Sequence, residues 1–470
     1  MRTVWIILFC LFVGALALGP SLLSDKPAAD EKIVIISPHW DGIKHEFGRA
    51  FEEYYFRAKQ KRIAVEWLDI GGTGEIRKFI NQRFAQTGAS GGIGVDILFG
   101  GGMDMLPRFA DANFFEPYPL PPDLESAIPA AVHGQPLRDK QNRFHAACLS
   151  GFGFVYNSEV LESARLPAPK AWGDLGRPEF RGWVTCGDPG QSGSLHQAFE
   201  LVLQAEGWDK GYRTLGRMLS NVRACNEGGT SIPRDVSLGQ AAVGPCIDFY
   251  ASAPARRQGA THLQLVIPEG VSLATPDCIA MFRSPQNPAA AQEFIRFVMS
   301  ETMPNGDPGG QRLWYQVRGS EGGPKEYDCE RLPVMPSVYE KNYPTFTVIN
   351  PFKDAPSFKY DGRKTGDRWD LMNLIWRAMF IDVQDHLWDA RKAIIDAKRD
   401  ADLGFEVVKP PFTEEQLMSM TKVFFTPDQR NSLRNKWSAW ARKRYQGIAK
   451  AAQHGSAYDD SPAPLPDGVK

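Results

Sequence analysis

Two glycine-rich turns carry the residue types and spacings best suited to chemistry in this 470-residue chain. The first is residues 71–74 (GGTG), and the second is residues 188–194 (DPGQSGS). Each turn precedes a segment with helical periodicity, so it leaves unpaired backbone N–H groups at a helix start. Those donors, with the partial positive charge of the helix dipole, favour an anionic or carbonyl-rich ligand. The pair of turns therefore indicates two lobes that close on one small molecule.

The side chains of the two turns add hydroxyl donors to these N–H groups. Gly72 and Thr73 are predicted to hydrogen-bond a ligand, and the alternative for Thr73 is a helix cap that needs no ligand. Ser192, Gly193 and Ser194 have the same two interpretations. Binding is favoured there because two hydroxyl groups flank a glycine at a helix start.

Further candidates are polar or aromatic residues in and beside predicted strands. For His39 the alternative is a loop histidine bonded to the backbone, and for Trp40 it is a place in the core. The spacing of His39 and His45 suits no usual metal motif, so neither a metal nor a cofactor is expected. The remaining residues predicted to bind ligand are Ser37, Gly101, Ser150, Thr230, Asp248 and Tyr250.

The sequence favours a binding protein over an enzyme. It contains no Gly-x-Ser-x-Gly elbow, no His-Glu-x-x-His pair and no phosphate-binding loop with its lysine. The 54 basic and 55 acidic residues balance, which argues against nucleic acid as a partner, since nucleic acid selects a basic face. A small molecule is the expected partner.

The N-terminus has the pattern of a targeting segment. Arg2 precedes an apolar run over residues 4–18, and small residues at 15–17 suit a signal peptidase. Residues 1–19 are therefore predicted to be a signal peptide, with an uncleaved membrane anchor as the alternative, and residues 20–31 to be a linker. Export allows disulfides, but the six cysteines other than Cys10 of the predicted signal peptide permit 15 connectivities, and buried free thiols are an equal alternative. The six are Cys148, Cys186, Cys225, Cys246, Cys278 and Cys329.

The turns must be positioned by strands and helices that alternate. Strands are predicted over residues 32–37, 63–69 and 95–99, with helices over residues 43–58 and after the first turn. This order predicts a parallel sheet covered by helices, with ligands beyond the carboxyl ends of the strands. A second set of strands follows over residues 144–156, 183–186, 222–226, 242–249 and 278–282.

The last third of the chain is predicted to be helical. Residues 369–398 form one long periodic stretch. Thr413 with Gln416, and Thr426 with Gln429, have the spacing of capping boxes at helix starts. Residues 453–470 are polar and proline-rich, and we expect them to be a frayed tail.

Eight short segments, in order, resemble the extracellular solute-binding proteins of ABC importers, in the subgroup that binds iron, phosphate esters, thiamine or polyamines. They are residues 72–76 (GTGEI), 95–98 (VDIL), 153–157 (GFVYN), 171–175 (AWGDL), 178–182 (PEFRG), 188–194, 238–243 (LGQAAV) and 287–290 (NPAA).

The resemblance implies an α/β fold of the type II periplasmic-binding-protein class. Two lobes would be joined by hinge strands near residues 145–156 and 275–283. The C-terminal helices up to about residue 400 would pack back on the first lobe, and a helical extension would follow them. The implied division is residues 32–149 and 275–400 for lobe 1, residues 150–274 for lobe 2, and residues 401–470 for a helical extension and tail.

The resemblance also implies a function. The protein would be the monomeric, periplasmic or extracellular component that binds a small polar, anionic or phosphate-bearing solute and delivers it to a membrane ABC permease. The alternatives are a ferric-iron-binding protein and a membrane-anchored ligand sensor or adaptor. Iron-binding relatives carry two adjacent tyrosines where this chain has Phe249 and Tyr250, which argues against iron.

Overall fold

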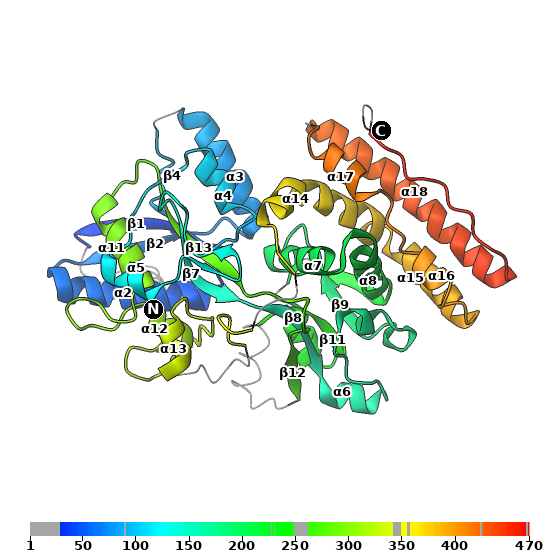
Figure 1. Ribbon diagram of the computed structural model, residues 1–470, viewed down its shortest axis with the longest axis horizontal. Helices are drawn as coiled ribbons and strands as arrows, with labels where there is room; N and C mark the ends of the chain where they lie inside the picture. Colours follow the sequence, from blue (N-terminus) through cyan, green and yellow to red (C-terminus); the bar gives the residue numbers. More distant parts are fainter. Residues whose placement is uncertain are drawn as a thin grey trace, which may run out of the picture.

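Two α/β lobes, each built on one sheet, make up the computed structural model (Figure 1). The structure describes residues 29–88, 91–226, 228–229, 231–248, 262–341, 349–354, 358–423, 425–466 and 469. In Figure 1, lobe 1 lies to the left and contains the blue and cyan segments, and lobe 2 lies to the right in green. The predicted two-lobed fold is confirmed.

The sheet of lobe 1 aligns the carboxyl ends of its parallel strands. β1 (Glu31–Ile36) pairs in parallel with β2 (Ile63–Leu68) and β3 (Ile97–Phe99), and Ile36 is opposite both Leu68 and Leu98. The loops that follow these strands therefore meet at one edge, as the β-α-β-α-β order predicts. The other strands are β4 (Phe115–Glu116), β7 (His145–Ser150) and β13 (Thr275–Phe282).

Helices α2 (Asp41–Lys59), α3 (Thr73–Thr87) and α11 (Pro288–Met299) belong to lobe 1. The apolar residues of α2 recur at helical spacing, and Ile43, Phe47 and Phe51 are fully buried. This spacing places one apolar stripe against the sheet, which is why the segment folds as a surface helix.

Lobe 2 is built on a mixed sheet in the order β10-β9-β11-β8-β12. β7 ends at Ser150 in the first sheet and β8 begins at Phe152 in the second, so the chain crosses between lobes at Gly151. It returns before Thr275. The strands are β8 (Phe152–Asn157), β9 (Val184–Gly187), β10 (Val222–Asn226), β11 (Val243–Ile247) and β12 (Leu263–Val266), covered by α7 (Gly193–Glu206) and α8 (Trp208–Ser220).

The C-terminal helices pack on lobe 2, so the expectation that they pack back on lobe 1 is wrong. Trp376 stacks on Tyr212 of α8 with ring centroids 5.1 Å apart, and the side chains of both lie in the core of lobe 2. The apolar surface of α7 and α8 needs a cover, and these helices supply it. They are α14 (Gly362–Trp376), a π-helical turn (Arg377–Ile381), α15 (Gln384–Asp396), α16 (Leu403–Glu406), α17 (Glu414–Met420) and α18 (Pro427–His454).

In this C-terminal region the predicted helix starts are confirmed, whereas the length of one predicted helix is wrong. The capping boxes of Thr413 with Gln416 and of Thr426 with Gln429 are both formed, which confirms the two predicted helix starts. The predicted helix over residues 369–398 is instead two helices, because the π-helical turn and the residues after it separate α14 from α15.

The predicted frayed tail packs along α18 in its described residues. The indole N–H groups of Trp437 and Trp440 donate to the carbonyl oxygens of Pro464 (2.8 Å) and Ser461 (2.9 Å). Ala463 is buried. Polar composition predicts a solvated tail, but two tryptophan donors that need acceptors hold this one in place.

The six cysteines of the described chain are free thiols, so the structure follows the buried-thiol alternative. Burial raises the pKa of the Cys225 thiol to about 12. In the described residues no helix is both long and apolar enough to span a membrane. Residues 1–28, which include the predicted signal peptide, lie outside the described residues.

Candidate functional site

A pocket of about 680 Å³, its open mouth included, lies between the two lobes. Its walls come from the loops after β1 and β3, from the starts of α3 and α7, from both crossing points and from α14. It therefore lies at the carboxyl edge of the lobe 1 sheet, where the strand order places a ligand.

The two glycine-rich turns meet at this pocket across the lobe boundary. A Cβ added to Gly193 would lie 2.8 Å from Thr73 Oγ1, and one added to Gly72 would lie 3.0 Å from the carbonyl oxygen of Gln191. These distances leave no room for a side chain, so both glycines are needed for the turns to approach this closely. The lobes are therefore closed on the pocket.

The helix starts present free donors to the pocket. Thr73 is the first residue of α3, and Gly193 and Ser194 are the first two of α7. The hydroxyls of Thr73 and Ser194 have no hydrogen-bond partner in the part of the chain that the structure describes. Two positive helix ends with two unpartnered hydroxyls favour an anion between them.

A hydrogen-bonded network of His39, Asp277 and Arg331 forms another part of the pocket wall. His39 Nε2 lies 3.1 Å from Asp277 Oδ2, and Asp277 Oδ1 accepts the Gly101 N–H at 2.6 Å. Arg331 Nη1 lies 3.6 Å from Asp277 Oδ2 and also bonds the Ser150 hydroxyl. Asp277 thus ties the loop after β1, the loop after β3 and the Arg331 segment to β13.

Opposing effects set the pKa values of this network. Burial raises the pKa of the Asp277 carboxyl, but His39, Arg331 and the Gly101 N–H outweigh burial and hold that pKa well below its usual range. Burial lowers the pKa of His39, so the imidazole is neutral at neutral pH. An ionised, fully engaged carboxylate and a neutral histidine position the loops and are poorly suited to proton transfer.

The donor atoms of His39, Cys148 and Asp277 lie within 4.8 Å of one another and form the one described group with the spacing of a metal site. The Arg331 guanidinium beside the carboxylate opposes a second cation. Burial raises the pKa of the Cys148 thiol well above its usual value, and a thiol is a poor ligand until it is deprotonated. His39 and Asp277 are therefore better described as members of the hydrogen-bonded network, with Cys148 a buried free thiol beside them.

The structure brings together six of the residues predicted to bind ligand. The pocket is lined by His39, Thr73, Gly101, Ser150, Gly193 and Ser194. Their contact with a solute stays a prediction. Thr230 and Tyr250 lie outside the described residues, as does Phe249.

The other five predicted residues are not among those that line the pocket; the structure gives each a structural contact, and their contact with a solute also stays a prediction. The Ser37 hydroxyl lies 3.1 Å from both the backbone N–H and Nδ1 of His39 and so holds that ring, and Trp40 packs against the core at the start of α2. Gly72 provides the close approach described above. Ser192 Oγ accepts the Leu195 N–H (3.3 Å) as the N-cap of α7, and Asp248 Oδ2 accepts the Gly151 N–H (2.7 Å) at the crossing point.

Several pocket residues were missed from the sequence. Asp277 and Arg331 are brought to His39 from more than 200 residues away. Gln197 lies one turn after Ser194 on α7, and this i, i+3 spacing is the local signal that could have identified it. Trp369 comes from α14, in a region with no turn motif.

Acid is expected to destabilise the fold through His196, which is fully buried against Trp369. Burial lowers the pKa of His196 to about 4, below its ordinary 6.5, so the unfolded chain binds a proton that the folded chain does not. The free energy of unfolding should fall as pH drops from about 6.5 toward 4, by about 1.4 kcal/mol per pH unit for this one proton.

The measurement is urea unfolding between pH 5 and pH 7, above the range where the carboxylates titrate. His196→Gln should reduce the dependence of the unfolding free energy on pH by the equivalent of about one proton. The variant His454→Gln, at an exposed position, should leave this dependence unchanged. An equal slope in His196→Gln and the parent protein would contradict the prediction.

Comparison with known proteins shows which proteins this chain is similar to. Residues 94–305 match the family model described as bacterial extracellular solute-binding protein. The periplasmic binding protein AfuA from Actinobacillus pleuropneumoniae, with exogenous fructose-6-phosphate bound, aligns over 75% of this chain and 99% of its own at 19% identity and a TM-score of 0.57. The apo ferric ion-binding protein A of Pasteurella haemolytica aligns over 73% of this chain and 95% of its own, at 13% identity and a TM-score of 0.54.

A curated relative matches a shorter part of the chain. The phosphoglycerate transport regulatory protein PgtC of Salmonella typhimurium is 27% identical over 190 residues, which is 40% of this chain and 45% of that protein. The match thus spans less than half the length of that relative. The chain thus has the two-lobed fold of these periplasmic binding proteins, and its residues 94–305 match the solute-binding family, as the resemblance of its segments implied.

Proposed function

We propose that this protein captures a small, phosphate-bearing organic solute between its lobes and delivers it to a membrane ABC permease. The observation that carries the proposal is the meeting of two helix N-termini from opposite lobes at one pocket, each with an unpartnered hydroxyl, Thr73 and Ser194. A phosphoryl group offers several oxygens, so it can accept from both helix starts at once and draw the lobes together.

The comparisons support a phosphate-bearing ligand. AfuA is recorded with fructose-6-phosphate, and PgtC is named for phosphoglycerate transport. Ferric iron is the competing ligand, and it prefers hard anionic oxygens such as phenolates. No tyrosine lines the pocket among the described residues. The helix starts favour an anion over a cation, so iron ranks second.

The remaining parts of the proposal follow from the class of protein. The protein acts as a monomer outside the cytoplasm, residues 1–19 direct its export, and the closed form docks on the permease. It performs no chemistry on the solute, because His39, the histidine that lines the pocket, is neutral and held by Ser37 and Asp277.

A thermal-shift screen tests the ligand class. The panel is inorganic phosphate, organic phosphates, phosphonates, unphosphorylated sugars, polyamines, thiamine and ferric citrate. A ligand at about 100 times its dissociation constant adds roughly 2.7 kcal/mol of stability. Stabilisation by phosphate-bearing compounds alone supports the proposal. Stabilisation by ferric citrate or by an unphosphorylated compound, with none from phosphates, overturns it.

Ser194→Ala and Ser192→Ala form a matched pair that separates binding from capping. Ser194 faces the pocket, so its loss should weaken phosphate-ligand binding about tenfold to a hundredfold, for a lost bond to a charged group of roughly 1.5–3 kcal/mol. Ser192 caps α7, so its loss should lower stability by about 1 kcal/mol. Calorimetric titration and thermal melts on both variants measure the two effects.

One outcome for Ser194→Ala would exclude this hydroxyl from solute binding. Unchanged affinity together with lowered stability in Ser194→Ala would show a purely structural hydroxyl.

A further inference from the structure

The second glycine-rich turn, residues 188–194, is a point where lobe 2 meets lobe 1 at the pocket. The carbonyl oxygen of Gly190 would lie 3.3 Å from a Cβ added to Gly74 in the first turn. The same turn leads into the first residues of α7, Gly193 and Ser194, which line the pocket. A shift of this turn would therefore move the contact between the lobes and the donors at the start of α7 together.

Asp188 fixes the shape of this turn from inside. Its Oδ1 accepts the Gly190 N–H at 2.8 Å, and its backbone carbonyl oxygen accepts the N–H groups of Gln191 and Ser192 at 3.0 and 3.1 Å. The Asp188 side chain is 6% exposed, and Asp188 is not among the residues that line the pocket. The carboxylate thus acts on the turn and not on the solute.

Arg377 holds this carboxylate from the C-terminal region. Arg377 Nη1 donates to Asp188 Oδ2 at 2.6 Å. Arg377 begins the π-helical turn that follows α14, and such irregular turns recur at functional sites. The match to the solute-binding family ends at residue 305, so the charged partner of Asp188 comes from outside the matched segment.

Further contacts keep Arg377 and the start of α7 in place. Arg377 Nε lies 3.7 Å from Asp382 Oδ1, and Asp382 accepts two hydrogen bonds from the Arg434 guanidinium of α18. Asn373, one turn before Arg377 on α14, has its Oδ1 2.6 Å from Nδ1 of His196 in the first turn of α7. Figure 1 shows α14 beside α7. The C-terminal helices therefore brace both the glycine-rich turn and the helix that follows it.

We propose that Arg377 is a positioning residue for solute binding, which fixes Asp188 and, through Asp188, the donors at the start of α7. This inference rests on the proposed function, because those donors are the groups proposed to bind the phosphoryl group. Arg377 is not among the residues that line the pocket, so it acts through the turn. Without the Arg377 cation, the buried carboxylate loses its charged partner and is free to move toward solvent. The turn must then be ordered when the solute binds, and that cost lowers the affinity.

Calorimetric titration of Arg377→Met with fructose 6-phosphate, glycerol 3-phosphate and inorganic phosphate tests the proposal. Affinity should fall about fivefold to twentyfold, and by the same factor for each probe that the parent protein binds, because all three share the phosphoryl group. The Arg377 side chain is 41% exposed, so its loss should shift the melting temperature of the ligand-free protein by no more than a few degrees. Arg377→Lys keeps a cation near Asp188 and should retain most of the affinity.

A double-mutant cycle separates an effect through Asp188 from any other effect of the substitution. In an Asp188→Asn background the carboxylate charge is absent, so adding Arg377→Met should weaken binding by less than about twofold more. The matched control is Arg177→Met in lobe 2. The Arg177 side chain is 50% exposed, its Nη2 lies 2.7 Å from Asp174 Oδ1, and neither residue lines the pocket, so every affinity should stay unchanged.

Three results would overturn the inference: unchanged affinity in Arg377→Met, an equal loss of affinity in Arg177→Met, or an undiminished effect of Arg377→Met in the Asp188→Asn background. Ser194→Ala distinguishes this failure from a failure of the proposed function. If Ser194→Ala weakens binding of the probes and Arg377→Met does not, the proposed function stands and the inference fails. If no probe binds to the parent protein, the proposed function fails as well.

Discussion

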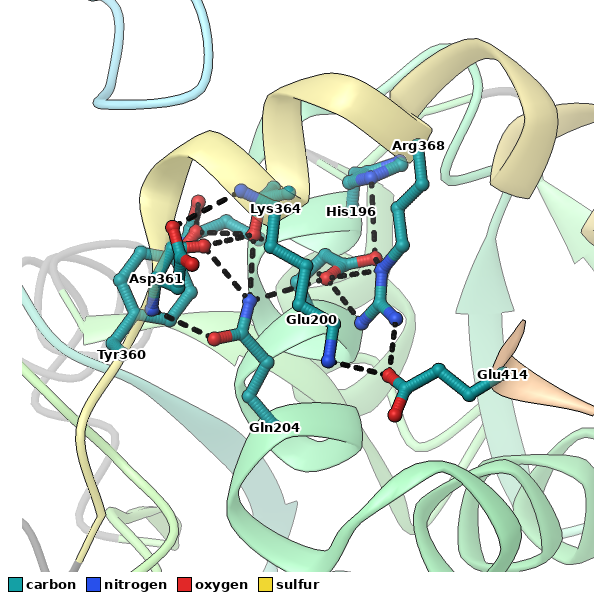
Figure 2. Close-up of polar contacts among 10 residues, drawn as sticks. His196, Glu200, Gln204, Tyr360, Asp361, Lys364, Arg368 and Glu414 are labelled. Carbon is teal, nitrogen blue, oxygen red and sulfur yellow. Dashed lines mark hydrogen bonds and ion pairs between the residues drawn. The ribbon is translucent and has the colours of Figure 1, made fainter. Parts of the chain in front are cut away.

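Replacement of Arg368 by methionine is expected to lower the free energy of unfolding by about 3–5 kcal/mol, because it leaves the carboxylate of Glu200 buried without its partner. Arg368 Nε and Nη2 donate to the two oxygens of Glu200 at 3.0 and 2.7 Å, and each side chain is 1% exposed (Figure 2). Denaturant unfolding of the variant at pH 7 measures the loss.

The double variant Glu200→Gln/Arg368→Met removes the charge along with its partner, so it should recover much of that stability. An exposed pair on the neighbouring helix provides the matched control. Lys392 and Asp396 are both about 60% exposed, and Lys392→Met should cost no more than about 0.5 kcal/mol. An Arg368→Met cost no larger than that of Lys392→Met would contradict the prediction.

Acid should weaken this pair as well. Burial raises the pKa of the Glu200 carboxyl, but the Arg368 guanidinium outweighs burial and the net pKa lies below its ordinary 4.5. The stability that the pair contributes is therefore fully present above about pH 4.5, and it is lost as pH falls through the folded-state pKa of Glu200.

Substitution of Gly193 by alanine should oppose closure of the lobes without weakening either lobe. The new Cβ would lie 2.8 Å from Thr73 Oγ1 and 3.1 Å from Thr73 Cβ across the boundary, which are distances that force the turns apart. Overpacking of this kind costs about 1–3 kcal/mol, so ligand affinity should fall about fivefold to a hundredfold. Alanine is a good helix former at the start of α7, so the melting temperature of the ligand-free protein should hold.

Two measurements check the Gly193→Ala prediction. X-ray scattering should give a larger radius for the variant than for the parent protein under the same conditions. Gly173→Ala, in lobe 2 at a glycine with nothing within 4 Å of the added Cβ, should change neither radius nor affinity. A Gly193→Ala variant as compact and as tight-binding as the parent protein would show that the turns do not meet in solution.

Elements whose cause is local could be predicted from the sequence. The strand predicted over residues 63–69 is β2 (Ile63–Leu68), because alternating β-branched and aromatic residues favour a strand wherever the segment lies. Both C-terminal capping boxes formed for the same reason, since each needs only two side chains three residues apart. The glycine-rich turns were likewise found from their own residues.

Features that depend on distant partners could not be predicted. An apolar helix stripe shows that a helix is covered, and not by what, so α14 and α15 were expected on lobe 1 and lie on lobe 2. The residues of the candidate site likewise divide into those with a local sequence signal and those positioned by distant partners. Thr73 and Ser194 carry a local signal, whereas Trp369 reaches the pocket because α14 packs on α7, where the Glu200–Arg368 pair is one of the contacts between the two helices.

The division of the two cores along the chain sets an order for folding when the chain emerges with its N-terminus first. The core of lobe 1 draws its buried residues from Ile33 to Tyr339, whereas the core of lobe 2 runs from Phe152 to Ala463. Lobe 1 can thus complete its core while roughly the last quarter of the polypeptide has yet to emerge. Lobe 2 must wait for the C-terminal helices, and until they arrive its central strands and helices expose apolar surface. A chain truncated late would therefore have one finished lobe and one vulnerable to aggregation and proteases.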